Sequence, residues 1–438
     1  MVPLIIVFGK LILFISRKFN IGSGGTWPGE IALIFKHNIL SDFISQIKKG
    51  VIIIAGTNGK TTTSKMVTQI IGQTKVIHNR SGANLMNGLV SAFIESSSLT
   101  GKINADYAVL EVDENTLIHV ILNCKVKDKI SKKLIIVLLN LFRDQLDRYG
   151  EVDIIANKWQ EALDDLPQDS TVILNADDPL IAYLGSRLKN KVVYFGINRP
   201  NKFLPKFEHA TDSIYCRKCN SKLRYKGIYF SHLGIWFCEK CGNRRPKPTI
   251  ENYYSPLPGL YNEYNSLAAI SIGRELGVKE KEMEAALVNF TPAFGRQEEF
   301  NVNGKRIKVF LSKNPAGFNA SLKTILDLKP TIILFVLNDR IPDGRDISWI
   351  WDVDFEILPQ TIDIIVSGDR AYDMGLRIKY TMRQCNDITM KRLIVEKELK
   401  KAIKEGLNKT KRNKTLYILP TYSAMLEVRE ILTGRKIL

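Results

Sequence analysis

The chain has 438 residues and a mass of 49.7 kDa, which favours two or three domains over a single small module. Apolar residues make up 45% and charged residues 25%, so the composition excludes a wholly disordered chain. The 63 Lys and Arg exceed the 45 Asp and Glu, and the net charge of +18 indicates an anionic partner. Nucleic acid, a membrane surface and phosphate-rich small molecules remain open at this point.

Residues 1–46 are predicted to form an N-terminal helix and a lead-in segment. The first residues are apolar apart from Lys10 and have no small-residue cleavage site after them. The stretch is also shorter than the roughly 20 residues that a spanning helix needs. A buried first helix is favoured, and a helix lying on a membrane is the alternative. The expected location is the cytoplasm, with contact to the inner face of the cell membrane left open.

Short apolar runs alternate with amphipathic stretches, as in a parallel α/β sheet. The runs at 51–56, 107–112, 134–140 and 171–176 predict buried strands that each lead into polar residues. Open α/β sheets bind ligands at that edge. Residues 47–295 are therefore predicted to form a middle α/β domain, and residues 296–438 a second, Rossmann-like α/β domain.

Residues 55–64, AGTNGKTTTS, form a glycine-rich turn between a predicted strand and a predicted helix. Backbone N–H groups of such a turn surround phosphate oxygens, and the helix N-terminus adds partial positive charge. Lys60 would reach the β- and γ-phosphates, and the Thr61 hydroxyl would coordinate Mg²⁺. Ile54 replaces the first glycine of the strict pattern, so the loop is a shorter variant. The predicted ATP-binding residues here are Gly56, Thr57, Asn58, Gly59, Lys60, Thr61 and Thr62.

Carboxylates follow the next predicted strands. Glu111 closes the run at 107–112 and is a candidate ligand of Mg²⁺, directly or through water. Asp113 and Glu114 are equally compatible with ordinary loop acids. Asp144 and Asp147 lie just beyond another strand end.

Two CxxC pairs, 18 residues apart, predict a structural zinc ribbon inserted at about 204–251. The expected Zn²⁺ ligands are Cys216, Cys219, Cys238 and Cys241. Four thiolates leave no open coordination position, so a catalytic metal is not expected there. A small core organised by the metal is expected from Ile228, Phe230, Ile235 and Trp236. The basic residues around the ribbon keep a nucleic-acid-binding ATPase as an alternative.

The motifs GTNGKTTT, EVDE, LNADDP, PGLYNEYNSLAA and FGRQE resemble those of the Mur ligases in order and context. The Cys₄ insertion and residues 338–356 and 367–380 are similar to the synthetase subunits of lipid II isoglutaminyl synthases. The resemblance implies a Mur ligase-type P-loop ATPase domain followed by a Rossmann-like domain. It also implies ATP-dependent amidation, through an acyl phosphate, of the α-carboxyl of D-glutamate in the lipid II stem peptide. The ammonia would come from a GatD-like glutaminase subunit in a heterodimer.

The resemblance further implies roles for single residues. Asn262 and Arg296 would contact the nucleotide, and Lys158 lies where many family members carry a carbamylated lysine; a plain surface lysine is the alternative. Residues 311–316 read LSKNPA where amino-acid-adding relatives have a D-Y-A-H-N-P-like motif. That departure fits ammonia as the nucleophile. It leaves Lys313 as a phosphate or carboxylate contact, or as a surface lysine.

The chain shows no glutaminase nucleophile, because neither Cys124 nor Cys385 lies in a suitable turn beside a histidine. An aspartate of this chain is expected to complete the partner's Cys–His pair. Asp352 is the first choice, since SWIWD gives it rigid aromatic neighbours, and Asp346 is the second, with a helix cap as its alternative. Asp343 and Asp354 lie in the same stretch. The alternative functions are a folylpolyglutamate synthase-type amide ligase and the nucleic-acid-binding ATPase.

Overall fold

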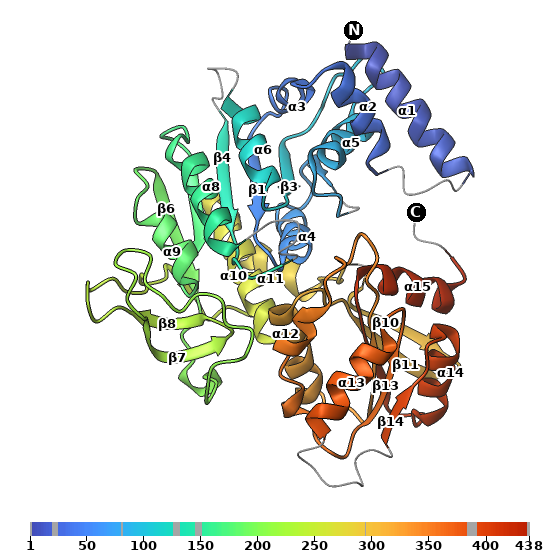
Figure 1. Cartoon of the computed structure of the whole chain (residues 1–438). Helices are drawn as coiled ribbons and strands as arrows, with labels where there is room; N and C mark the ends of the chain where they lie inside the picture. Colours follow the sequence, from blue (N-terminus) through green and yellow to red (C-terminus); the bar gives the residue numbers. More distant parts are fainter. Residues whose placement is uncertain are drawn as a thin grey trace.

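The computed structural model describes residues 2–19, 25–79, 82–125, 132–144, 151–293, 295–382 and 392–435. Asp147 and Cys385, both named in the sequence analysis, lie outside these residues. Within these residues the chain forms two α/β units, each built around one large sheet. A small two-stranded hairpin lies at the side of the first unit (Figure 1). No helix within these ranges is long and apolar enough to cross a bilayer.

The first sheet has seven parallel strands in the order β2-β3-β1-β4-β5-β6-β9. Their bounds are β1 Gly50–Ala55, β2 Val76–His78, β3 Tyr107–Glu111, β4 Lys133–Leu138, β5 Thr171–Asn175, β6 Lys191–Gly196 and β9 Ile250–Glu251. The central strands are apolar on both faces because helices cover both. One face carries α4 (Lys60–Ile70), α10 (Leu260–Glu275) and α11 (Glu280–Val288). The other carries α5 (Met86–Ser96), α6 (Thr116–Lys125), α8 (Val152–Asp164) and α9 (Pro179–Gly185).

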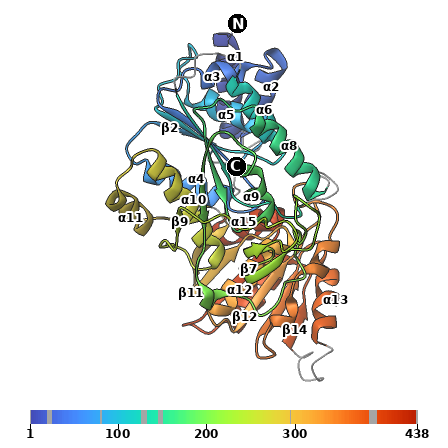
Figure 2. The same ribbon diagram turned by 90° about the vertical axis from the view of Figure 1, so that its left-hand side faces the viewer.

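Three helices precede this sheet: α1 (Val2–Phe19), α2 (Trp27–Phe35) and α3 (Ile39–Ile44). They lie at the end of the molecule farthest from β14 and α13 (Figures 1 and 2). Ile6 and Leu13 of α1 are buried, whereas Leu4, Phe8 and Phe14 on its other side are exposed. The favoured prediction of a buried first helix is therefore wrong for half of the helix surface.

The inserted segment forms the antiparallel hairpin of β7 (Arg224–Phe230) and β8 (Leu233–Phe237), preceded by the short 3₁₀ helix η1 (Pro200–Lys202). The predicted separate core of four apolar residues is wrong. Trp236 packs with Cys216 and Cys238, but Phe230 and Ile235 pack in the core of the middle domain. Phe230 lies 5.6 Å from Phe142 and 5.8 Å from Tyr264, measured between ring centroids. The hairpin thus belongs to the wall of the middle domain.

The second sheet has six strands in the order β10-β11-β15-β12-β13-β14, and only the β10–β11 pair is antiparallel. The bounds are β10 Arg296–Val302, β11 Lys305–Phe310, β12 Ile332–Val336, β13 Asp363–Ser367, β14 Leu393–Val395 and β15 Thr415–Pro420. One face packs on α12 (Pro315–Asp327), α13 (Ala371–Met382) and the 3₁₀ helices η2 (Ser348–Asp352) and η3 (Phe355–Ile357). The other packs on α14 (Leu399–Lys409) and α15 (Tyr422–Thr433). The chain enters this sheet at Arg296, and the numerical domain limits stay a prediction.

Candidate functional site

The glycine-rich loop joins β1 to α4 at the carboxyl edge of the first sheet. Gly56 and Gly59 have φ values of +143° and +92°, in the region that favours glycine. A Cβ on Gly59 would lie 2.2 Å from Oδ1 of Asn265, so a side chain there would displace the Asn265 side chain from the loop. Because α4 begins at Lys60, the free N–H groups of its first turn lie at this loop. The local geometry is that of an anion-binding loop.

Lys60 is buried within the loop. Its Nζ donates a hydrogen bond to the carbonyl of Gly56 at 2.6 Å and lies 3.6 Å from Oε2 of Glu114. Glu114 is only 4% exposed, so it is not an ordinary loop acid. Burial raises the pKa of Glu114, while the charges of Lys60 and Lys313 oppose that rise. From the sequence alone Glu114 had no assigned role, although its position two residues after the predicted strand 107–112 placed it near the expected binding edge of the sheet.

Glu111, at the end of β3, faces the first turn of α4. Its Oε1 accepts a hydrogen bond from the Thr61 hydroxyl at 3.1 Å, and its Oε2 accepts one from Ser64 at 3.4 Å. Burial raises the pKa of Glu111, and the charges of Lys60 and Arg296 lower it in part. Thr61 and Glu111 thus offer adjacent hydroxyl and carboxylate oxygens, a donor set suited to Mg²⁺.

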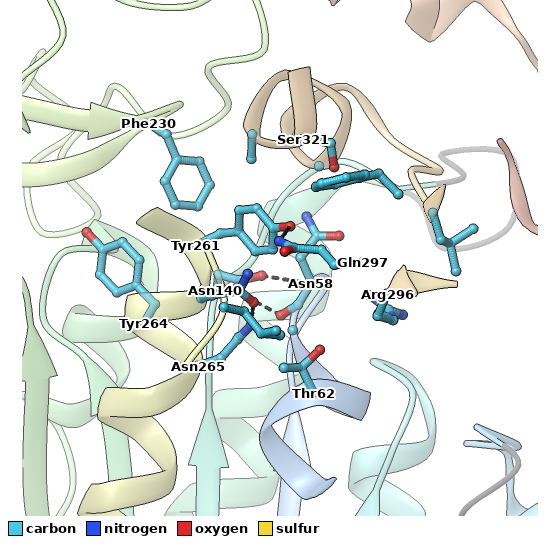
Figure 3. Close-up of a pocket in the computed structure, with 17 residues that line it drawn as sticks. Asn58, Thr62, Asn140, Phe230, Tyr261, Tyr264, Asn265, Arg296, Gln297 and Ser321 are labelled. Atoms are coloured by element: carbon cyan, nitrogen blue, oxygen red, sulfur yellow. Dashed lines mark hydrogen bonds between the residues drawn. The ribbon is translucent and has the colours of Figure 1, made fainter. Parts of the chain in front are cut away.

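A pocket opens beside the loop, between the middle domain and the second sheet (Figure 3). Asn58 and Thr62 line it from the loop and α4, Tyr261 and Asn262 from α10, and Arg296 from β10. Asn262 donates to the carbonyl of Pro258 at 2.7 Å and accepts from Asn265 at 3.1 Å. The structure therefore brings Asn262 and Arg296, far apart from the loop in sequence, into one pocket with it.

Polar contacts join the two domains beside the loop. Asn58 and Asn314 exchange side-chain hydrogen bonds of 3.3 and 3.1 Å. Nearby, the Lys313 ammonium pairs with the buried carboxylate of Asp144. Burial lowers the pKa of Lys313, but the charges of Asp144 and Glu114 outweigh it and the net shift is upward. The Lys313 side chain is thus paired within the chain, and its contact with a phosphate or carboxylate of a substrate stays a prediction.

Lys158 lies outside this pocket. It is an exposed residue of α8, and its Nζ is 3.5 Å from Oδ1 of Asn115. Its neighbour Trp159 donates to the carbonyl of Glu114 at 2.8 Å. The Lys158 side chain is therefore adjacent to the loop that carries Glu114, without a contact of its own to Lys60.

The four candidate aspartates of residues 343–354 have different environments. Asp343 and Asp354 are buried and hold local structure, since they accept hydrogen bonds from Ser423 and Asn319 respectively. Asp346 is exposed and accepts hydrogen bonds from the backbone N–H and the hydroxyl of Ser348, two residues further on, whereas the N-cap position of η2 is Ile347, so the cap given as its alternative is not formed. The Asp352 side chain is 38% exposed, and its Oδ2 lies 3.3 Å from Nη1 of Arg143.

The Asp346 and Asp352 side chains line one pocket with Asp144 and Lys313. Trp351, beside Asp352, is 49% exposed and packs 5.9 Å from Tyr380, measured between ring centroids. Asp352 thus combines an accessible carboxylate with exposed aromatic neighbours, close to the domain junction. Cys124 is buried, and that burial raises its pKa to about 12, so its thiol is unreactive.

The four cysteines converge as a metal-binding cluster. Their sulfur atoms all lie within 4.8 Å of one another, with Cys216–Cys241 at 3.6 Å and Cys219–Cys238 at 3.5 Å. Tetrahedral Zn²⁺ with Zn–S bonds of about 2.3 Å needs sulfur separations of about 3.8 Å. The donor set and spacing therefore fit structural zinc.

The residues around the cluster attach it to the middle domain. Arg245, which follows the second cysteine pair, forms an ion pair of 2.5 Å with Asp177 at the end of β5. Asp177 also accepts a hydrogen bond from the Tyr264 hydroxyl at 2.6 Å, and the Trp236 indole donates to the Ala176 carbonyl at 3.1 Å. One of the basic residues near the ribbon thus has a structural role.

Comparison with known proteins agrees with this architecture. The Mur ligase middle domain model matches residues 54–273. A solved pseudomurein peptide ligase type C from Methanothermus fervidus superposes with a TM-score of 0.66 at 24% identity, covering 90% of this chain and 81% of that one. That likeness shows a shared fold. With the phosphate loop and the two-sheet arrangement, these findings define a protein of the Mur ligase class.

The C-terminal part of the chain shows to which group of Mur ligases it belongs. The MurT ligase C-terminal model matches residues 311–425. The chain is 33% identical to the "Lipid II isoglutaminyl synthase (glutamine-hydrolyzing) subunit MurT" of Streptococcus pneumoniae, over 95% of this chain and 94% of that protein. It is 35% identical to the same subunit of Staphylococcus aureus strain COL, over 89% of both chains. The chain belongs to the MurT family of Mur ligases, whose members are ATP-dependent ligases.

Proposed function

We propose that this chain is the synthetase subunit of a lipid II isoglutaminyl synthase. It would convert the α-carboxyl of D-glutamate in the lipid II stem peptide to the amide of D-isoglutamine, a step of peptidoglycan synthesis. The observation that carries the proposal is the phosphate loop with Glu111 at the domain junction, in a chain similar to MurT subunits over nearly its whole length. That similarity favours this ligase over the folylpolyglutamate synthase and nucleic-acid-binding ATPase alternatives.

The nucleotide would bind between the loop and the pocket of Figure 3. The N–H groups of residues 56–62 and the Lys60 ammonium would hold the phosphates, and Asn262 and Arg296 would contact the nucleotide from the far wall. Thr61 and Glu111 would hold Mg²⁺. ATP supplies the phosphoryl group that converts the substrate carboxylate into an acyl phosphate. Ammonia then attacks the carbonyl carbon, and the C–O bond to phosphate breaks.

The junction between the domains suits a small nucleophile. Lys313 is held by Asp144 where amino-acid-adding ligases carry a histidine, and the resulting LSKNPA segment lacks their acidic residue. Ammonia would come from a GatD-like glutaminase bound in a heterodimer. Asp352 is the residue proposed to complete the partner's catalytic Cys–His pair, because its partly exposed carboxylate lies beside the exposed Trp351, and Asp346 is the second candidate. Lys158 is proposed to be carbamylated, which would place a negative carboxylate beside the loop of Glu114.

The proposed location is the cytoplasm, at the inner face of the cell membrane where a lipid-linked substrate is accessible. The Cys₄ ribbon would hold Zn²⁺ in a structural role, since four thiolates fill its coordination sphere.

The test is reconstitution of the chain with its glutaminase partner, lipid II, ATP and Mg²⁺. Mass spectrometry of the stem peptide is expected to show replacement of one hydroxyl by an amino group, with either glutamine or ammonium as the nitrogen source. ADP should form in equal amount. Amidation with neither source, in a complex that binds ATP, would overturn the proposed function.

A further inference from the structure

The outer surface of the first two helices is apolar. On α1, the side chains of Leu4, Val7, Phe8, Leu11, Phe14 and Ile15 are all at least 41% exposed. Their spacing of three and four residues places them on one side of an α-helix. On α2, the exposed side chains are Trp27, Ile34 and Phe35, at 57%, 68% and 62%. We call these nine residues the N-terminal apolar face.

The opposite side of α1 is already occupied by protein. Ile6 is fully buried and Leu13 is 6% exposed. A Cβ on Gly9 would lie 3.1 Å from Ile94 of α5 and 3.6 Å from Pro28 of α2, so these helices touch α1 closely. The helix is therefore fixed along the side of the domain, where Figures 1 and 2 show it at one end of the molecule. The N-terminal apolar face points away from that packing.

The charge around this face is positive. Residues 1–46 contain four Lys or Arg and two acids, Glu30 and Asp42, of which Asp42 pairs with Lys36; the other three basic residues are on α1, which carries no acidic residue. Lys18 lies at the end of α1 with its Nζ 5.7 Å from the ring centroid of Phe14. Fixed apolar helices with an exposed Trp and basic residues at the border are suited to the interface of an anionic bilayer. Lysine and arginine would contact phosphate headgroups while Phe and Leu enter the acyl region.

We propose that the N-terminal apolar face docks the protein on an anionic lipid bilayer, with α1 and α2 lying in the plane of the membrane. The face binds a lipid surface because the basic residues beside its apolar side chains complement the charge of anionic headgroups. This inference deepens the proposed location at the membrane and rests on that part of the proposed function. Binding to vesicles that contain no lipid II tests it separately from amidation.

The experiment is co-sedimentation of the full chain with vesicles of phosphatidylglycerol and phosphatidylcholine, or of phosphatidylcholine alone. We expect binding to the anionic vesicles and at least tenfold weaker binding to the neutral ones. The neutral double substitution Phe8→Gln with Phe14→Gln should weaken binding about tenfold or more. Its matched control, Leu99→Gln with Val288→Gln, changes two equally exposed apolar residues elsewhere and should bind as the wild type does.

A second measurement detects lipid contact at Trp27 by fluorescence and uses a single aromatic-for-aromatic substitution. Brominated lipids should quench fluorescence of the wild-type protein, and the Trp27→Phe variant should lose most of that quenching. Absence of binding to anionic vesicles, or equal binding by the Phe8/Phe14 variant and its control, would overturn the proposal. So would self-association in sedimentation velocity that requires Phe8 and Phe14 and occurs without vesicle binding, because the face would then bind a second copy.

Discussion

Lys313 and Asp144 form an ion pair that joins the two domains at the edge of the proposed active site. Lys313 follows β11 of the second sheet, and Asp144 follows β4 of the first, so the pair forms only when both sheets are assembled. Glu114 adds a second negative charge to the surroundings of Lys313 and a contact to Lys60 of the phosphate loop. The charges therefore alternate in sign from Lys60 of the phosphate loop through Glu114 to Lys313 of the second domain.

Removal of the lysine charge should weaken this junction. Lys313→Met leaves the buried carboxylate of Asp144 without its paired cation and Glu114 with Lys60 alone, and the unfolding free energy should fall by about 2 kcal/mol. Amidation with ammonium should fall at least tenfold. The control is Lys401→Met, whose exposed pair with Glu398 should contribute less than about 0.5 kcal/mol. Denaturant unfolding and initial rates measure both effects, and equal behaviour of the two variants would contradict the role of the ion pair.

Glu111→Gln separates metal binding from folding. The amide keeps the size of the side chain and one of its two acceptor oxygens, but a neutral oxygen is a poorer ligand of Mg²⁺. We expect the Mg²⁺ concentration for half-maximal activity to rise at least tenfold and kcat to fall about 100-fold. A Mg²⁺ titration of the rate measures this. Unchanged Mg²⁺ dependence would exclude Glu111 as a ligand.

The same variant predicts a pH dependence of stability. Burial raises the pKa of Glu111 from its ordinary 4.5 in the folded chain. Below pH 4.5 the carboxyl is protonated in both states, and its contribution to stability is fully present. As the pH rises through the folded pKa, that contribution is lost, because the unfolded chain ionises more easily. In Mg²⁺-free buffer the wild type should therefore lose stability relative to Glu111→Gln as the pH rises above 4.5, and a constant difference would contradict the buried environment.

The two candidate aspartates should differ in their dependence on the nitrogen source. In the heterodimer, Asp352→Asn should lower glutamine-driven amidation about 100-fold and leave ammonium-driven amidation within a factor of two. Asp346→Asn should preserve both activities and most of the stability, because the amide oxygen can still accept the hydrogen bond from the backbone N–H of Ser348. Loss of glutamine-driven activity in Asp346→Asn, with Asp352→Asn active, would reverse the ranking.

The zinc ribbon predicts one Zn²⁺ per chain. Cys238→Ser should reduce the zinc content to near zero, measured by plasma mass spectrometry, and lower the unfolding free energy by on the order of 3 kcal/mol. Cys124→Ala removes a buried thiol outside the cluster and should retain the metal. A protein that is free of zinc and equally stable would contradict a structural site.

Lys158→Ala tests the proposed carbamate through chemical rescue. Activity should fall and recover with added short-chain carboxylate, which can replace the negative group beside Asn115. Because the added carboxylate is not covalently attached, the rescue is measured over a series of carboxylate concentrations up to saturation. An inactive variant without rescue would contradict carbamylation, and full activity would show that Lys158 is a surface lysine.

The sequence by itself determined the features made by neighbouring residues. The phosphate loop needs glycine at positions of positive φ within a few residues, and each zinc knuckle needs two cysteines at fixed spacing. Such local requirements appear directly in the order of residues. The apolar strand cores, such as β1 and β4, were also predictable, because strands covered on both faces have continuous apolar runs.

Only the tertiary structure decided the features that depend on distant parts of the chain. Lys313 contacts Asp144, which lies 169 positions away in the sequence. Phe230 packs against Tyr264 in the core of the middle domain and not within the zinc ribbon. Which side of α1 is buried depends on Pro28 and Ile94, since all sides of the helix carry apolar residues. Long-range packing fixes such contacts, and periodicity along one segment holds no information about the partner that covers it.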